Sequence, residues 1–256
     1  MSLQHLGVFL IGILVGFLGG LFGKGGSAIA TPMLSLIGLP GFVAVTAPLP
    51  ATIPGTLIAS LEYKRSNLVD WQIVRWSVLV GVPATIIGSY LTEFTGATPL
   101  LIITGLMVLA FGVSFLLSPR EAGHLSGRLN SADEEVPRNW RLRLVLVATF
   151  VGLISGLLAN SGGFLLAPSY ARILNQPIKK AFACSLAVSM FLALPGTLVH
   201  AFLGHIDWSV TLVLALGSVP FSYLGAKVAI NAKAKNLERW YGLALTALGA
   251  FFLLKL

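Results

Sequence analysis

Long apolar stretches, separated by short polar connections, follow one another along almost the whole chain. Ten such segments can be distinguished, and most approach the length of about 20 residues that a membrane-spanning helix needs. The pattern predicts an all-α polytopic membrane protein, because the alternating ten-residue segments of a transmembrane β-barrel are not visible. The segments cover residues 4–22, 26–38, 43–61, 72–91, 98–117, 142–159, 163–174, 180–203, 208–226 and 237–256.

The ten segments fall into two halves of five that resemble each other. Asp70 corresponds to Asp207 and Gly88 to Gly225, each 137 residues further along the chain. Internal repeats of this kind are typical of secondary transporters. We therefore expect a single transmembrane domain over residues 1–256. It consists of repeat one (1–118), a polar cytoplasmic loop (119–141) and repeat two (142–256).

The basic residues indicate how the segments cross the membrane. If all ten cross and the central loop is cytoplasmic, 15 of the 17 Lys and Arg residues lie on the cytoplasmic side. If the short segments 26–38 and 163–174 were re-entrant instead, this bias would disappear, so the positive-inside rule favours ten crossings. Five crossings per repeat is an odd number. We therefore expect the two repeats to be inverted relative to each other, with both termini outside.

The composition supports a membrane protein and indicates which kinds of partner to expect. Hydrophobic residues make up 56% of the chain and charged residues 10%, whereas soluble domains carry about 25% charged residues. The net charge of +8 does not indicate nucleic-acid binding here, because the basic residues lie in short loops where they set orientation. We expect a multi-pass protein of the cell (inner) membrane. Its partners would be the lipid bilayer and a small anionic substrate, and a homodimer stays open.

Two glycine-rich breaks, one in each repeat, are the strongest candidates for a binding site. The first covers Gly19–Gly26 and the second Asn160–Gly163. Non-helical backbone at membrane depth is tolerated only where protein or a water-filled cavity satisfies its polar groups. The short segment after each break would span only about 18–20 Å as a helix, so its N-terminus begins inside the membrane. Helix N-termini carry free N–H groups and partial positive charge, and two that converge near the midplane predict an anion site.

The third segment of each repeat also carries candidate polar groups. In repeat one, three prolines interleave with threonines, which predicts unwound backbone that lines a cavity. A kinked helix whose hydroxyls bond to their own carbonyls is the alternative. Close helix packing is likewise the alternative role for the glycines, and packing is the alternative for the single cysteine. The predicted substrate-binding residues are Gly23, Lys24, Gly25, Gly26, Ser27, Thr46, Thr52, Asn160, Ser161, Gly162, Gly163, Cys184, Ser185 and Ser189.

The sequence resembles the TauE/SafE family of sulfite-exporter-like membrane proteins at these same positions. Each half of that family opens with a glycine-rich run, reaches a Leu-x-x-Pro-like step and continues with an Ala-Val-Gly-Thr-Ser-Leu-like stretch and a Val-Asp-Trp. The corresponding residues here are Gly19–Gly26 with Pro32, Ala44–Leu49 and Val69–Trp71, then Gly162–Gly163 with Pro168, Ala181–Leu186 and Ile206–Trp208. The resemblance implies transport of small sulfur oxyanions or organosulfonates, such as sulfite, sulfoacetate or thiosulfate. The chain departs from the family at Lys24, which replaces a glycine, and at Thr46–Pro48, which replaces Gly-Thr-Ser.

Three classes of function stay open from the sequence. A secondary transporter that works by alternating access is the leading one. An intramembrane enzyme would need a nucleophile–base pair or a metal cluster, and four scattered histidines and one cysteine do not supply these. We therefore expect no enzymatic activity, no catalytic residue, no metal and no cofactor. The third class is a passive anion channel or an assembly subunit. ATP-driven transport would need a separate ATP-binding subunit, because the chain has no P-loop motif.

Overall fold

The computed structural model describes residues 3–23, 27–91, 97–117, 139–158, 160–202 and 204–254. Within these ranges the chain is helical, with short connections and no strand, and six of the helices are long and apolar enough to cross a membrane. The helices are α1 (Leu3–Phe22), α2 (Ser27–Leu36), α3 (Gly41–Thr46), α4 (Pro48–Arg65), α5 (Trp71–Leu91), α6 (Ala97–Leu117), α8 (Trp140–Leu157), α9 (Gly163–Arg172), α10 (Ile178–Phe202), α11 (Trp208–Asn231) and α12 (Ala234–Leu254).

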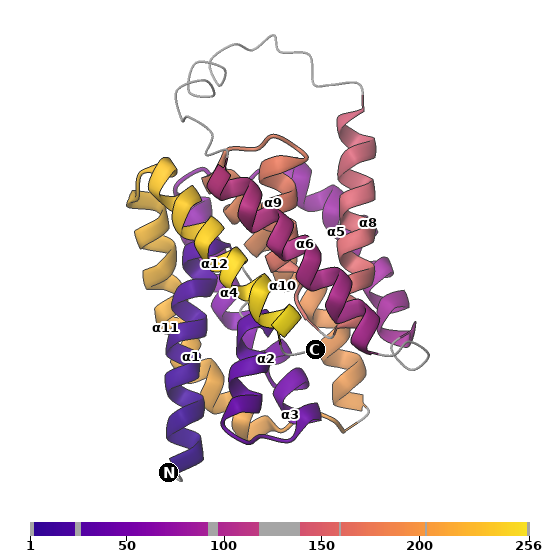
Figure 1. Cartoon of the computed structure of the whole chain (residues 1–256), viewed down its shortest axis with the longest axis vertical. Coiled ribbons are helices and arrows are strands. Elements are labelled where there is room, and N and C mark those ends of the chain that lie inside the picture. The colour runs from indigo at the N-terminus through magenta and orange to yellow at the C-terminus, as the bar shows by residue number, and fades with distance from the viewer. Residues whose placement is uncertain are drawn as a thin grey trace.

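All ten predicted segments are present as helices, with α3 and α4 together forming the third. The connections between α4 and α5, between α9 and α10 and between α11 and α12 lie at one end of the bundle (Figure 1). This end, which we call the basic end, holds most of the described Lys and Arg residues. The α2–α3 and α10–α11 connections lie at the opposite end (Figure 1). The short helices α2 and α9 therefore run in opposite directions, as the prediction of inverted repeats requires.

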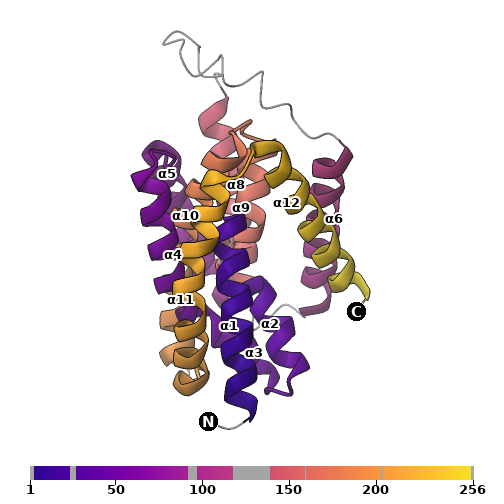
Figure 2. The ribbon, with the colours of Figure 1, turned by 90° about the vertical axis from the view of Figure 1, so that its left-hand side faces the viewer.

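Helix packing follows the same symmetry. The closest helix pairs are α1 with α11 and α5 with α8, and these pairs correspond to each other when the repeats are exchanged. Helices α6 and α12 correspond to each other and pack together on one side of the bundle (Figure 2). In the interior, α4 packs against α10, its own counterpart. The helix caps follow the symmetry too, because the corresponding residues Asp70 and Asp207 accept backbone N–H groups at the starts of α5 and α11.

Small residues allow the two close pairs to form. A Cβ atom at Gly16 or Gly20 of α1 would overlap the backbone carbonyl oxygen of Ser218 or Ser222 of α11. Within a bilayer, small residues of this kind let helix backbones approach and gain van der Waals contact. Gly20 belongs to α1 and is helical. The first break is therefore shorter than predicted, because its opening residues belong to α1 and Gly20 serves helix packing.

The equivalent pair of repeat two is built in the same way. A Cβ atom at Gly152 or Gly156 of α8 would overlap the carbonyl oxygen of Gly81 or Thr85 of α5. The two pairs thus form a frame of glycine-packed helices on opposite sides of α4 and α10. This frame positions the second break, where Gly162 packs against Val151 and Ser155 of α8 and Leu192 of α10.

The prediction of unwound backbone is wrong within α4 and α10, and the third segment of repeat one is interrupted at Ala47, between α3 and α4. Helix α4 runs without interruption, because Pro48 and Pro50 lie in its first turn, where backbone N–H groups need no helical partner. Pro54 lies inside the helix. The hydroxyls of Thr52 and Thr56 donate to carbonyls of the preceding turn at 2.9 Å each, as the alternative interpretation requires. Helix α10 is likewise continuous.

A glycine-to-alanine pair on α1 tests the packing of the frame. Gly16→Ala forces a methyl group into the α11 backbone, so it should lower stability by about 1–3 kcal/mol. Gly7→Ala on the same helix meets only the Ile37 side chain at 3.5 Å and should be neutral or slightly stabilising. Thermal unfolding of the detergent-solubilised protein measures both. Equal midpoints for the two variants would show that α1 and α11 do not pack as described.

Candidate functional site

The second break is a buried turn in which the carbonyl oxygens of Asn160 and Gly162 accept hydrogen bonds from neighbouring groups. Gly162 has φ +69°, a left-handed conformation that glycine adopts without steric cost. The Asn160 side chain accepts the N–H of Gly162 at 2.7 Å, and the Ser155 hydroxyl donates to the Asn160 carbonyl oxygen. The Gly162 carbonyl accepts two N–H groups of the first turn of α9 at 3.0 Å. Asn160, Ser161 and every residue from Gly162 to Ala171 are buried.

The donors of this turn are not all used. The N–H groups of Gly163 and Phe164, at the start of α9, have no acceptor among the described residues. Such N–H groups carry the partial positive charge of a helix N-terminus. Here they are enclosed by protein rather than exposed to water. Helix α9 has 10 residues, so its dipole is that of a helix of almost three turns.

Helix α10 presents a row of side chains to the same turn. Ser185 donates to the Gly163 carbonyl oxygen at 3.1 Å. Leu192, two turns further along α10, lies against Gly162, 3.2 Å from where a Cβ would stand. Ser189 lies between these two contacts on the same face, is fully buried, and its hydroxyl has no hydrogen-bond partner among the described residues. A buried hydroxyl without a partner costs free energy, so it points to a ligand that completes its hydrogen bonds.

The first break reaches the same helix. Gly23 has φ +67° and packs directly on the backbone of Phe182, one turn before Ser185 on α10. The two breaks therefore meet within about one helical turn of each other along α10. Lys24, Gly25 and Gly26 lie outside the described residues, and the Ser27 side chain is not described either. Their predicted role in binding stays a prediction.

Other predicted residues lie away from the breaks. Thr46 is buried at the end of α3 and donates to the carbonyl oxygen of His205, at the end opposite the basic end. Cys184 is buried on another face of α10, where its sulfur accepts the Asp70 N–H at 3.3 Å. Thr46 and Cys184 therefore join helices to loops. Of the residues singled out by sequence, the structure brings together Gly23, Asn160, Ser161, Gly162, Gly163, Ser185 and Ser189.

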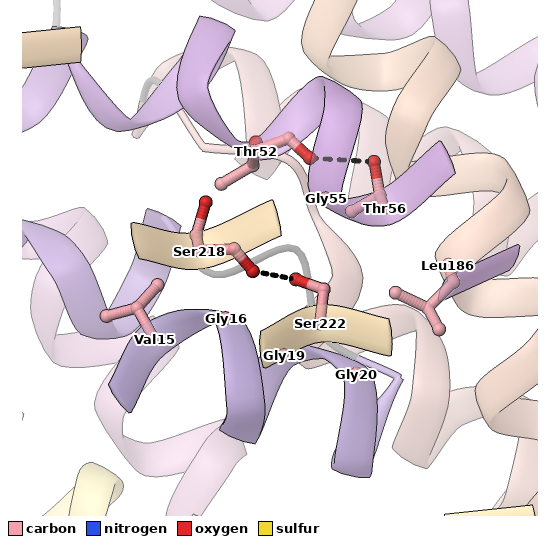
Figure 3. Close-up of a pocket in the computed structure, with 10 residues that line it drawn as sticks. All are labelled: Val15, Gly16, Gly19, Gly20, Thr52, Gly55, Thr56, Leu186, Ser218 and Ser222. Atoms are coloured by element: carbon pink, nitrogen blue, oxygen red, sulfur yellow. Dashed lines mark hydrogen bonds between the residues drawn. The ribbon is translucent and has the colours of Figure 1, made fainter. Parts of the chain in front are cut away.

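Thr52 lines a small cavity beside the first break (Figure 3). The cavity holds about 10 Å³, room for about one water molecule. Its threonine and serine hydroxyls bond largely to carbonyls of their own helices, so they offer few free donors. Sequence reasoning missed most of this lining, although small residues at four-residue intervals in α1, α4 and α11 were its signal. The lining residues are Val15, Gly16, Gly19, Gly20, Thr52, Gly55, Thr56, Leu186, Ser218 and Ser222.

Fold and site together define a class of protein. A polytopic helical membrane protein with two inverted repeats, in which the short helix α9 starts at a buried break, has the architecture of secondary transporters. Comparison with known families supports a membrane transporter. The chain belongs to the family described as sulfite exporter TauE/SafE, whose model matches residues 8–252.

Curated relatives cover nearly the whole chain and are named as probable membrane transporters. A probable membrane transporter protein of Xylella fastidiosa (strain 9a5c) is 28% identical over 98% of this chain and 96% of its own length. Probable membrane transporter protein YunE of Bacillus subtilis (strain 168) is 24% identical over 89% of this chain and 88% of its own length. Probable membrane transporter protein MJ0441 of Methanocaldococcus jannaschii is 23% identical over 96% of this chain and 94% of its own length. No solved structure matches the chain significantly.

Two glycines with the same backbone conformation provide a matched test of the break. Gly162 and Gly204 both have φ +69°, so alanine is strained at either position by about 1–2 kcal/mol. At Gly162 the new methyl would also stand 3.2 Å from three side-chain atoms, whereas nothing lies within 4 Å at Gly204. Gly162→Ala should therefore be the more destabilising in thermal unfolding. If Gly204→Ala cost as much or more, the turn would be looser than described.

Proposed function

We propose that this protein is a secondary transporter of the cell (inner) membrane that moves a small anion by alternating access. The proposed substrate class is a sulfur oxyanion or organosulfonate, such as sulfite, sulfoacetate or thiosulfate. The observation that carries the proposal is the buried start of α9. There the N–H groups of Gly163 and Phe164 and the hydroxyl of Ser189 lack acceptors among the described residues.

The electrostatics of this region favour an anion. Helix N-termini attract negative charge, and the attraction is stronger in a site that excludes water. No Asp or Glu occurs in the break or anywhere in α10, so the sequence places no competing negative charge on these two elements. The carbonyl oxygens of Asn160, Gly162 and Gly163 already accept hydrogen bonds. The N–H groups of Gly163 and Phe164 and the Ser189 hydroxyl can therefore donate to a ligand.

The number of free donors suits an –SO₃ group. Sulfite and organosulfonates present three oxygen atoms on one sulfur, and the α9 turn offers two N–H groups and one hydroxyl. The family description, sulfite exporter, supports the same substrate class. Export of such an anion needs little coupling, because an inside-negative potential assists efflux by about 2.3 kcal/mol per charge per 100 mV.

The two repeats differ in a way that supports alternating access. Helix α9 is packed beneath α6, where Arg172 donates to the Ser114 carbonyl oxygen at 3.0 Å and lies 4.0 Å from the Phe115 ring centroid. Its counterpart α2 is less enclosed, with Leu36 66% exposed. An open apolar groove of about 340 Å³ separates α2 from α12. Inverted repeats that adopt unequal conformations open the site to one side, and exchanging those conformations opens it to the other.

The Ser189 hydroxyl provides the sharpest test of substrate binding. Ser189→Ala removes a donor to the anion, so the apparent KM for sulfite in proteoliposomes should rise about ten- to a hundredfold. Stability should stay equal or rise, because a buried hydroxyl without a partner is lost. Flux must saturate with substrate, which distinguishes a transporter from a passive channel.

Ser89→Ala is the matched control for Ser189→Ala. The Ser89 hydroxyl bonds to the Thr85 carbonyl of its own helix at 2.9 Å, so its loss should leave the KM unchanged. If the KM is unchanged in both Ser189→Ala and Ser89→Ala, the binding site lies elsewhere. A fall in stability without a change in KM would assign Ser189 a structural role.

A cross-link across the α2–α12 groove tests the conformational exchange. Met33 and Leu248 line the groove from its two sides, and the native Cys184 is buried and can be replaced by alanine. In Met33→Cys/Leu248→Cys, a disulfide should hold α2 against α12, stop transport, and release it again on reduction. The single-cysteine variants control for the substitutions. Full transport by the cross-linked protein would show that α2 does not move relative to α12.

A further inference from the structure

Two histidines face each other at the end of the bundle opposite the basic end. His200 lies in the last turn of α10, and His205 lies in the connection to α11. Their Nδ1 atoms are 3.4 Å apart, the ring centroids are 5.6 Å apart, and the ring planes are inclined by 40°. Both side chains are half-buried, so each is fixed by protein contacts and still reachable from water.

The backbone holds this pair in place. The His205 N–H donates to the His200 carbonyl oxygen at 3.0 Å, and the Gly204 N–H donates to the Ala201 carbonyl oxygen at 3.1 Å. With Gly204 at φ +69°, these bonds form a Schellman motif, which brings the two flanking side chains into contact. The pair is therefore preorganised by the end of the helix.

Other helix ends of the chain use the same motif with ordinary residues. The end of α4 has the same two bonds, and its flanking residues are Tyr63 and Leu68, each 137 residues before the corresponding histidine. The end of α2 has Leu34 and Leu39 in these places. Hydrophobic contacts are what such motifs normally contain. Ending the helix therefore does not require imidazole side chains at these two positions.

The separation of the two nitrogen atoms suits a bridging cation. At 3.4 Å it lies beyond the range of about 2.7–3.2 Å for a good nitrogen-donor hydrogen bond. Two imidazole nitrogens bound to one tetrahedral Zn²⁺ at about 2.0–2.1 Å stand about 3.3 Å apart. Small rotations of the rings would thus place both lone pairs on one ion.

We propose that His200 and His205 bind a divalent transition-metal cation of the Zn²⁺ type through their Nδ1 atoms. The described residues contain no group of three His, Cys, Asp or Glu side chains, so water completes the coordination. Asp207 adds negative charge to the same connection. The bound ion would fix the end of α10 to the α10–α11 connection. The same connection is also held to α3, because the Thr46 hydroxyl donates to the His205 carbonyl oxygen.

Zinc binding to the purified, tag-free protein tests this site independently of transport. Equilibrium dialysis with Zn²⁺ alone should show one ion per chain, and either His200→Gln or His205→Gln should weaken binding at least tenfold. His5→Gln keeps both proposed ligands and removes only a histidine whose charge acts on the neighbouring Asp207, so it should still bind one ion per chain.

Zinc-dependent thermal unfolding guards against variants that fold poorly. Zn²⁺ should raise the unfolding midpoint of the wild type and of His5→Gln. It should leave the unfolding midpoint of His200→Gln unchanged. Absence of stoichiometric binding to the wild type would overturn the proposal. So would equal binding by wild type and the His200→Gln/His205→Gln double variant. Neither result would bear on anion transport, because the two sites share no residue.

Discussion

A backbone polar group at membrane depth must find a partner, and this requirement organises the second break. Side chains supply donors to its carbonyl oxygens, with Ser155 on Asn160 and Ser185 on Gly163. The Asn160 side chain accepts the N–H of Gly162. What remains unpaired among the described groups is a set of donors at the start of α9 and on α10. Because unpaired buried donors cost free energy, a site of this kind is best satisfied by an oxygen-rich anion.

The rest of the fold holds that turn in place. Small residues bring α1 against α11 and α5 against α8, and these two pairs enclose α4 and α10 from opposite sides. Helix α10 then serves both breaks, since Gly23 packs on Phe182 and Gly163 bonds to Ser185 one turn away. The symmetry of the repeats extends to helix caps and helix ends. The symmetry is broken at one place, because α6 encloses α9 whereas α12 does not enclose α2. A change between two conformations would occur there.

Sequence was sufficient for the framework because the framework depends on local chemistry. The length of the apolar stretches defined the ten segments, and the 137-residue repeat divided them into two halves. The sequence was insufficient wherever the role of a residue depends on the direction in which its side chain points. The proline spacing of the third segment suggested unwound backbone, but α4 is continuous and the Thr52 hydroxyl donates to the Leu49 carbonyl oxygen of the same helix. Cys184 and Ser185 are neighbours in sequence, yet the helical rotation between them sends one to Asp70 and the other to the break.

The central claim is that an oxyanion binds at the start of α9. Anomalous diffraction from crystals soaked in selenite, which has the shape and charge of sulfite and a heavier central atom, tests it most directly. We expect one anomalous peak per chain, within hydrogen-bond distance of the Gly163 and Phe164 N–H groups and of the Ser189 hydroxyl. A peak in the cavity beside Thr52, or no peak at selenite concentrations that block sulfite transport, would contradict the account.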